Sequence, residues 1–379
     1  MKIILFANTD WYLFNFRRSL ISALRKQGHD VLLVSPPGPY GKRLEELGFR
    51  WQPAPMERRS LNPLRELLLV LWLRSLFGHE GPDIVHGFTI KCAVYGSLAA
   101  RLAGVHARVN AVAGMGYVFT SKDLKARLLR PVVSALMRFA LDGHTARLIL
   151  QNPDDVRLFA ASRLVDPKRV RLIPGSGVDC IRFAPADGPD GSTPRKFRVL
   201  LPARLLWDKG LAEYVEAARQ LLRQRRQIQF LIAGEPDAGN PAAAPTSVLS
   251  EWVREGIVEW LGQVEDMPGL YRSVDCVVLP SYREGLPKGL IEAAACGLPL
   301  VTTDVPGCRE VVTHCVDGLL VPARDAASLA DAIARLHDSA SLRAKYGAAA
   351  RAKALAQFDE QIVIASTIAV YDELVNAAP

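Results

Sequence analysis

The chain reads PSYREGLPKGLIEA from Pro280 to Ala293, directly after the apolar run Asp275–Leu279. The apolar run predicts a buried strand, and the segment from Leu290 predicts a helix. Between them lies a loop that contains glycine, which lets a backbone approach a ligand closely. A buried strand, a loop and a helix in this order are the repeating unit of open α/β sheets, which bind ligands beyond the carboxyl ends of their strands. The stretch therefore predicts an α/β fold with a ligand site at this loop.

Two carboxylates belong to this stretch, Glu284 in the loop and Glu292 near the first turn of the helix. They can accept hydrogen bonds from different hydroxyls of one elongated polar ligand, and the free N–H groups at the start of a helix suit a phosphate. The alternative is a solvated Glu284 and a Glu292 on the helix surface. The E-x7-E spacing alone does not decide between the two.

A second cluster follows the apolar run Phe197–Pro202 and reads ARLLWDKG from Ala203 to Gly210. Arg204 can form two parallel hydrogen bonds with two oxygens, and Lys209 supplies a mobile point charge. Together they suit a departing diphosphate. Taken alone, such a cluster is more often a solvated turn.

Short apolar strands alternate with helical segments along the chain, which predicts parallel sheets covered on both faces. In the first half the expected elements are strands over Lys2–Ala7, Asp30–Val34, Asp83–His86, Arg108–Val112, Arg147–Leu150 and Arg169–Ile173 and a helix over Phe14–Gln27. In the second half they are strands over Phe197–Pro202, Ile228–Ala233, Ile257–Leu261, Asp275–Leu279 and Pro299–Thr302 and helices over Gly210–Arg225 and Leu290–Cys296.

The segment Pro174–Pro194 interrupts this alternation with four Gly and four Pro, which predicts an interdomain linker. We therefore expect two Rossmann-like domains, over residues 1–185 and 186–355. The remaining residues, 356–379, are expected to form a helix that crosses back to the first domain.

The composition excludes several classes of protein. A length of 379 residues suits two domains, and 49% apolar and 23% charged residues exclude disordered, collagen-like and small disulfide-bonded chains. The longest strongly apolar run, Leu67–Leu73, is too short to span a bilayer, and Met1–Ala7 is too short for the apolar region of a signal peptide, so we expect a cytoplasmic protein. The six cysteines are scattered without a C-x-x-C pair, which favours small core residues over metal ligands or disulfides.

Charge is unevenly distributed along the chain. Residues 1–185 hold 27 Lys and Arg against 14 Asp and Glu, whereas residues 186–379 hold 20 against 25. A basic half suits nucleic acid, an anionic membrane or a phosphorylated substrate, but no motif of the known nucleic-acid-binding modules is present. Met56–Phe77 and Lys122–Phe139 mix cations with large apolar residues at helical spacing. Interfacial helices on anionic lipid have this character, and so do core helices with a solvated basic back.

Across essentially the whole chain, these motifs resemble those of the family 4 retaining glycosyltransferases. In order, they are Gly177-Val178-Asp179-x3-Phe183-x-Pro185, Ala203-Arg204-Leu205-x3-Lys209-Gly210, Leu261-Gly262-Gln263-Val264, Asp275 with Pro280-Ser281, EGLPKGLIEAAACGLP from Glu284 to Pro299, Thr303-Asp304-x2-Gly307 and Asp317–Pro322. The resemblance implies a GT-B fold, in which two Rossmann-like domains face across a cleft.

The resemblance also implies how a nucleotide-sugar donor is bound. Arg204 and Lys209 would contact its diphosphate, and Glu284 would contact the sugar hydroxyls; these three are the catalytic candidates. Glu292 would contact the ribose, and the backbone around Val264 would meet the base. The loop backbone would line the sugar and phosphates through Gly285, Leu286, Pro287, Lys288, Gly289 and Leu290.

The amino-terminal half resembles a narrower branch, enzymes that add an N-acetylhexosamine or a related sugar to undecaprenyl-diphosphate-linked glycans. The residues that carry this resemblance are Asn8–Arg17, Asp83–His86, Thr89–Lys91 and Gly114–Phe119. Many family members have a Gly-Gly in the first loop and an active-site His in a later loop, where this chain has Asn8–Leu13 and Ala113.

His86 is therefore a further catalytic candidate, as a replacement for that His. A structural His at the end of a strand is the alternative. Candidates for acceptor binding are Asp10, Asn15 and Lys91.

The chemistry is expected to need no metal or other cofactor. No D-x-D motif suggests a metal site, and Asp154-Asp155 suits the first turn of a helix, where acidic side chains favour the helix dipole. Negative charge on the departing diphosphate would be stabilised by Arg204, Lys209 and helix amides.

We therefore expect a retaining glycosyltransferase, peripheral on the inner face of the plasma membrane, that acts in bacterial surface-polysaccharide synthesis. It would move a sugar, with N-acetylhexosamine as first candidate, from a UDP-sugar to a lipid-diphosphate-linked glycan. Two alternatives remain: a GT-B sugar-nucleotide epimerase, and a non-catalytic sugar-nucleotide-binding protein that docks on membrane. A nicotinamide-dependent dehydrogenase is disfavoured because no G-x-G-x-x-G follows either first strand.

Overall fold

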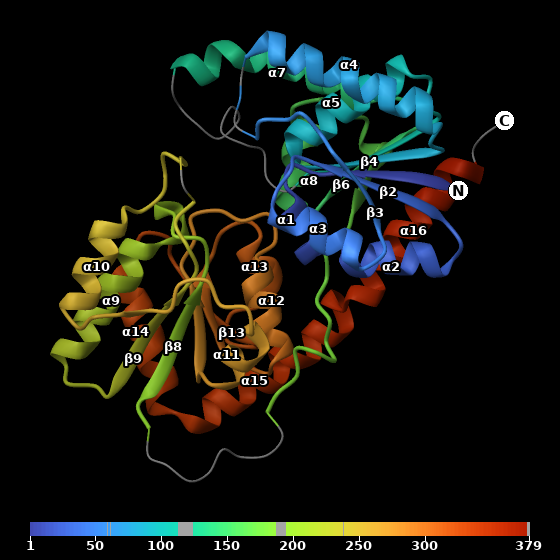
Figure 1. The fold of residues 1–379 in the computed structure, drawn as a ribbon. Coiled ribbons are helices and arrows are strands. Elements are labelled where there is room, and N and C mark those ends of the chain that lie inside the picture. Colours follow the sequence, from blue (N-terminus) through green and yellow to red (C-terminus); the bar gives the residue numbers. More distant parts are fainter. Residues whose placement is uncertain (59, 61, 113–123, 187–194, 238, 377–379) are drawn as a thin grey trace. The chain divides into compact units, whose positions relative to one another are not determined.

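The computed structural model describes residues 1–58, 60, 62–112, 124–186, 195–237 and 239–376. The chain divides into two compact units: unit 1 is Met1–Ser176 with Gln361–Pro379, and unit 2 is Gly177–Glu360. Each unit is built on one parallel sheet with helices on both faces (Figure 1). This architecture confirms the predicted α/β class with two Rossmann-like domains.

Within the described residues, unit 1 has a seven-stranded sheet in the order β3-β2-β1-β4-β5-β6-β7. The strands are β1 (Lys2–Phe6), β2 (Asp30–Ser35), β3 (Arg50–Pro53), β4 (Ile84–Phe88), β5 (Ala107–Val112), β6 (Ala146–Leu150) and β7 (Val170–Leu172). Strand β1 pairs in parallel with both β2 and β4, and the strand order reverses there. Such a reversal is the switch point at which open α/β sheets bind ligands.

Strand β3 was not among the expected strands. It lies at the edge of the sheet and contains no fully buried residue, so it lacks the apolar run that identified the others. Its Trp51 is fixed by a hydrogen bond from Nε1 to Ser35 Oγ of 3.0 Å.

The helical segments of unit 1 cover both faces of this sheet. They are α1 (Asp10–Tyr12), the π-helical turn η1 (Leu13–Arg17), α2 (Arg18–Lys26), α3 (Pro39–Glu46), α4 (Pro63–Glu80), α5 (Thr89–Leu102), α7 (Leu124–Leu141), α8 (Pro153–Ala161), η2 (Pro167–Arg169) and α16 (Glu360–Asn376). Helices α4, α5 and α7 gather on one side of the sheet (Figure 1). The single helix expected over Phe14–Gln27 is η1 followed by α2.

Helix α16 belongs to the core of unit 1, although it follows unit 2 in the sequence. Its Val363, Tyr371 and Leu374 are buried in one cluster with side chains of β1. The carboxylate of Glu373 accepts hydrogen bonds from Arg147 Nη2 at 2.8 Å and from Arg171 Nε at 3.1 Å. The helix is thus held by apolar packing and by two arginines.

Within the described residues, unit 2 has a six-stranded parallel sheet in the order β10-β9-β8-β11-β12-β13, which reverses between β8 and β11. The strands are β8 (Phe197–Pro202), β9 (Ile228–Ala233), β10 (Glu259–Trp260), β11 (Cys276–Leu279), β12 (Leu300–Thr303) and β13 (Gly318–Val321). The helices are η3 (Trp207–Lys209), α9 (Leu211–Arg223), α10 (Thr246–Arg254), α11 (Met267–Arg272), α12 (Lys288–Ala295), α13 (Cys308–Val311), α14 (Ala326–Asp338), α15 (Ala340–Lys353) and the π-helical turn η4 (Ala354–Phe358).

Part of the expected linker Pro174–Pro194 is packed structure. Val178, Cys180 and Phe183 are buried in a core cluster of unit 2. The Val178 N–H donates to Phe358 O at 2.9 Å, which ties this segment to η4. The glycines and prolines that suggested a linker are interspersed with apolar residues, and these apolar residues determine the packing.

All six cysteines are free thiols, and five of them are buried. No helix in the described part of the chain has both the length and the apolar character that a bilayer span demands.

Candidate functional site

At the switch point of unit 2, the loops that follow β8 and β11 bring Lys209 and Glu284 together. Lys209 Nζ lies 2.6 Å from Glu284 Oε1, and the two side chains are only 15% and 13% exposed. The buried hydroxyl of Ser281 donates to the same carboxylate oxygen at 2.7 Å. The structure therefore joins two of the predicted site residues and adds Ser281, which belongs to the Pro280-Ser281 motif but was not among the predicted site residues.

Two glycines make this meeting possible. Gly210 has φ +73°, and a Cβ there would lie 2.2 Å from Pro280 O. Gly307 has φ +83°, and a Cβ there would lie 2.6 Å from Glu284 O. Larger residues at either position would force the loops apart, so these glycines fix the distance between Lys209 and Glu284.

Arg204, the other predicted cation of unit 2, is bound to a different carboxylate. Its Nη1 lies 2.8 Å from Asp237 Oδ2, and its side chain is 53% exposed. Asp237 follows β9 in a loop rich in Gly, Ala and Pro, which carries no motif that would single it out. Arg204 is thus accessible to a ligand, with Asp237 as its counter-ion.

The predicted backbone donors, Gly285 to Leu290, lead into the first turn of α12. The N-cap residue of this helix, Pro287, has no side-chain acceptor, and the amino-terminal dipole of the helix lies at the loop. Gly289 lies close to the end of β8, since a Cβ on it would approach Pro202 O to 3.1 Å. Val264 follows β10 and packs, partly buried, against the core of unit 2.

Glu292 lies on α12 next to a buried tyrosine. The Tyr271 hydroxyl lies 3.2 Å from Glu292 Oε2 and 3.1 Å from Gly289 O. Burial raises the pKa of Glu292, while the charge of Lys288 and the bond from Tyr271 oppose that rise. Tyr271 therefore positions Glu292, and no sequence pattern pointed to this role.

The acceptor candidate Asp10 serves the fold of unit 1. It is 4% exposed, and its Oδ2 accepts hydrogen bonds from Tyr40 N at 2.7 Å and Gly41 N at 2.8 Å. These are amides in the first turn of α3, so Asp10 caps that helix. Asn15, on the exposed side of η1, donates from Nδ2 to Trp11 O at 3.0 Å.

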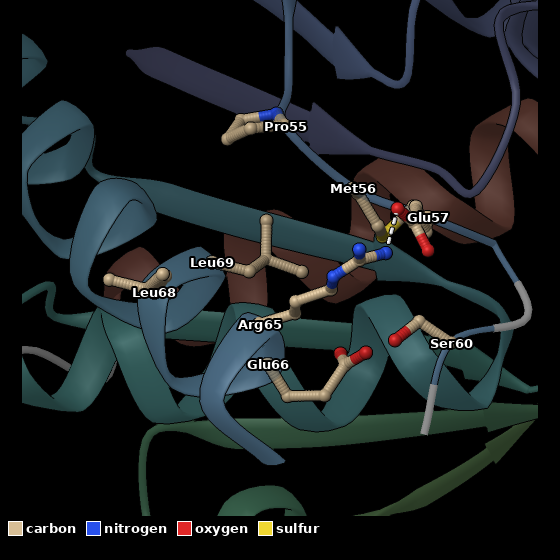
Figure 2. Close-up of a pocket in the computed structure, with 8 residues that line it drawn as sticks. All are labelled: Pro55, Met56, Glu57, Ser60, Arg65, Glu66, Leu68 and Leu69. Carbon is tan, nitrogen blue, oxygen red and sulfur yellow. Dashed lines mark hydrogen bonds and ion pairs between the residues drawn. The ribbon is translucent and has the colours of Figure 1, made fainter. Parts of the chain in front are cut away.

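The ammonium of Lys91, another acceptor candidate, is also hydrogen-bonded within unit 1. Its Nζ donates to Glu57 O at 2.6 Å, to Ser60 O at 3.1 Å and to Glu66 Oε1 at 2.8 Å. These bonds use all three N–H groups of the ammonium. Its three partners also line a pocket of about 150 Å³, together with Met56 and Leu69 (Figure 2).

His86 is buried in the core of unit 1, at 1% exposure. Its Nδ1 lies 2.6 Å from the Tyr371 hydroxyl on α16, and its ring centroid lies 4.1 Å from that of Phe88. Burial, helped by the charge of Arg17, lowers the pKa of His86 well below its usual value. The ring is therefore neutral and inaccessible, which favours the structural alternative; its predicted catalytic role stays a prediction.

Three predictions for unit 1 concern residues that the structure does not describe. Ala113, at the position of the family His, and Gly114–Phe119 both lie outside the described residues. So does the start of Lys122–Phe139. Within the described residues, no group of three or more His, Cys, Asp or Glu is placed to hold a metal ion.

Two family models match the two halves of the chain. The model described as "Glycosyl transferase 4-like domain" matches residues 15–176, and the model described as "Glycosyl transferases group 1" matches residues 196–339. Each match falls on one of the two sheets, and the second includes Arg204, Lys209, Glu284 and Glu292.

Characterised relatives match along most of the chain. An N,N'-diacetylbacillosaminyl-diphospho-undecaprenol alpha-1,3-N-acetylgalactosaminyltransferase of Campylobacter jejuni is 28% identical over 99% of this chain and 100% of its own. A UDP-Gal:alpha-D-GlcNAc-diphosphoundecaprenol alpha-1,3-galactosyltransferase of Escherichia coli is 28% identical over 74% of this chain and 73% of its own.

Solved structures share the fold. A glycosyltransferase of Rickettsia africae superposes with a TM-score of 0.79 at 18% identity, over 100% of this chain and 99% of its own. HepE of Anabaena, solved in complex with UDP, superposes with a TM-score of 0.77 at 19% identity, over 98% of this chain and 100% of its own.

Proposed function

Since the chain belongs to the group 1 glycosyltransferases of family 4, which are retaining enzymes with the GT-B fold, we propose that it transfers a sugar from a UDP-sugar to a lipid-diphosphate-linked glycan. The proposed pathway is bacterial surface-polysaccharide synthesis. The proposed sugar is an N-acetylhexosamine, because the Campylobacter jejuni relative, matched over its full length, is named for N-acetylgalactosamine transfer.

The observation that carries this proposal is the cluster of Lys209, Glu284 and Ser281 at the switch point of unit 2. Glu284 holds the Lys209 ammonium close to the loop backbone that leads into α12. A donor diphosphate in this place would be neutralised by Lys209 and Arg204 and by the amides of the α12 dipole. Glu284 would then accept hydrogen bonds from hydroxyls of the donor sugar, and Glu292 from the ribose.

In the proposed reaction, the bond between the sugar anomeric carbon and the diphosphate oxygen breaks while a bond to the acceptor hydroxyl oxygen forms on the same face. The hydroxyl proton passes to the departing diphosphate oxygen. Negative charge therefore grows on the diphosphate during the reaction. Lys209, Arg204 and the helix amides stabilise that charge, which is the electrostatic term that contributes most in such sites.

The test is UDP release by the purified protein from a panel of UDP-sugars, with and without a synthetic undecaprenyl-diphosphate-linked glycan. We expect release that depends on the acceptor, a mass gain of one sugar on the lipid-linked product, and a product anomeric configuration equal to that of the donor. Conversion of a UDP-sugar without acceptor would instead identify an epimerase. Tight UDP binding without release would identify a non-catalytic binding protein.

The proposed place of action is the anionic inner surface of the plasma membrane, with α4 as the contact. This helix exposes a leucine stripe at positions i, i+3, i+4 and i+7, namely Leu64, Leu67, Leu68 and Leu71, which are 72%, 55%, 64% and 45% exposed. Arg65, beside the stripe, has a side chain that is 59% exposed and forms an exposed ion pair with Glu57. Exposed leucines next to cations on a basic half suit the interface of an anionic bilayer.

Vesicle sedimentation tests this contact. We expect the protein to bind vesicles that contain phosphatidylglycerol, and Leu67→Glu with Leu68→Glu to abolish that binding. Leu355→Glu, at an exposed leucine of unit 2, is the matched control and should bind like the wild type. Equal binding by the stripe variant and the control would exclude α4 as the contact.

A further inference from the structure

Arg17, the last residue of η1, is a buried cation whose contacts within the described residues are all uncharged. It is 4% exposed, and its Nη2 donates to the Tyr12 hydroxyl at 2.8 Å. Its Cζ lies 4.3 Å from the ring centroid of Phe88 and 5.4 Å from that of Tyr12. Burying a charge without a counter-ion costs free energy, so a position that keeps one suits an anionic partner.

On one edge of the Arg17 guanidinium, only one of the two nitrogen donors has a hydrogen-bond partner among the described residues. Its Nε is buried and has no hydrogen-bond partner among the described residues, whereas the adjacent Nη2 bonds to Tyr12. The Nε–H and Nη2–H groups form one fork, which matches two oxygens of a phosphate. A neutral hydroxyl satisfies only one of these two donors.

The amino end of α5 lies next to Arg17. Phe88, on whose ring Arg17 stacks, is the last residue of β4 and the N-cap residue of α5. The Phe88 side chain does not cap α5, and the dipole of this 14-residue helix favours an anion at its first turn. Thr89 opens the helix with φ +71°, a conformation that is rare for a β-branched residue.

Arg17 and Phe88 lie at the switch point of the unit 1 sheet, where open α/β sheets bind ligands. Arg17 follows β1 and Phe88 ends β4, and the order of strands in unit 1 reverses between these two strands. In unit 2 the equivalent switch point holds Lys209 and Glu284. Segment η1 is π-helical, a rare conformation that is frequent at functional sites.

We propose that Arg17 and the amino end of α5 bind the diphosphate of the lipid-linked acceptor. This proposal rests on the proposed function, which places the diphosphate of the donor in unit 2 and leaves the diphosphate of the acceptor as the second anion of the reaction. Neighbouring His86 is neutral and contributes no positive charge, because its pKa is lowered by burial and by Arg17 itself. The fork of Arg17 therefore carries the recognition.

The first experiment measures binding of inorganic pyrophosphate by calorimetry to protein saturated with UDP, so that the donor site is occupied. We expect one site in the wild type, with affinity at least tenfold lower in Arg17→Gln. Arg18→Gln removes the same charge from the exposed neighbouring position and should bind like the wild type. Equal affinities of the two variants, or no binding by the wild type, would overturn the proposal.

Arg17→Lys serves if the glutamine variant does not fold, because lysine keeps the charge and loses the fork. We expect at least tenfold weaker pyrophosphate binding in this variant, a higher KM for the lipid acceptor and an unchanged KM for the UDP-sugar. An unchanged acceptor KM would overturn the proposal. Wild-type protein that binds pyrophosphate through Arg17 yet transfers no sugar to any lipid diphosphate would refute the proposed function and leave the anion site standing.

Discussion

The switch points of the two units differ in whether their cations are paired with carboxylates. In unit 2, Lys209 is paired with Glu284 and Arg204 with Asp237, each within hydrogen-bond distance. In unit 1, Arg17 has only uncharged partners within the described residues. Both places lie where the strand order of a parallel sheet reverses, so the fold provides the location and the loop side chains decide its electrostatic state.

The two switch points therefore represent two kinds of anion site, one with a cation paired with a carboxylate and one with an unpaired buried cation. A carboxylate partner holds a cation in place at lower cost than an unpaired cation carries, and an incoming anion must compete with that carboxylate. An unpaired buried cation costs stability in the empty protein, and the anion meets no competitor. Substitutions at the two places should therefore affect stability and binding differently.

The largest effect is expected at the Lys209–Glu284 pair. Lys209→Met and Glu284→Gln should each lower kcat/KM for transfer by about 100-fold or more, because the leaving diphosphate and the donor sugar lose their partners. Lys209→Met also leaves a buried carboxylate unpaired, which should cost about 3 kcal/mol of stability. Enzyme assays and urea unfolding measure the two effects separately.

The double variant Lys209→Met with Glu284→Gln separates catalysis from folding. It should regain most of the lost stability, since no unpaired charge remains, and it should stay inactive. Regained activity would mean that the pair acts only to hold the loops together.

The sequence predicted where the candidates of unit 2 lie better than it predicted the hydrogen-bond partners of the candidates in unit 1, and the proposed roles of both sets stay predictions. Arg204, Lys209 and Glu284 each follow a strand within a recognisable motif, so their positions at the sheet edge came from the alternation of strands and loops. Asp10 and Lys91 also lie near strand ends. Asp10, however, is hydrogen-bonded to amides of α3, and Lys91 is hydrogen-bonded to α4 and to the segment before it. Such partners come from parts of the chain far away in sequence, which no local pattern reveals.

Tyr271 is predicted to control the charge of Glu292 in unit 2. Tyr271→Phe removes a hydrogen bond that favours the charged form of Glu292, so the pKa of Glu292 should rise further. UDP affinity should fall about fivefold at neutral pH, and its loss on acidification should begin at a higher pH than in the wild type. Calorimetric titrations with UDP between pH 5.5 and 8 measure both changes. An unchanged pH profile would show that Tyr271 acts on Gly289 alone.

His86 provides the matching test in unit 1. Its pKa in the folded protein is far below 6.5, so the unfolded chain binds an extra proton when the pH falls below about 6.5. Between pH 7.5 and 5.5 this should cost about 1 kcal/mol of stability. His86→Gln should lack that loss, because Gln does not titrate. Hydrogen exchange of the β4 amides in urea reports on unit 1, and His144→Gln, at an exposed histidine of the same unit, should behave like the wild type.

The smallest effect is expected at Asp237, and it tests most directly whether a resident carboxylate competes with the donor. Asp237→Asn should tighten UDP binding two- to threefold at low salt, because the Arg204 guanidinium, which is 53% exposed, is freed from the carboxylate of Asp237, which is 9% exposed. The gain should vanish at high salt and in Arg204→Gln, which lacks the cation. Weaker binding by Asp237→Asn would mean that Asp237 orients Arg204 toward the diphosphate. Paired charges at this switch point would then position the cation, and only Arg17 in unit 1 would bind its anion without a competing carboxylate.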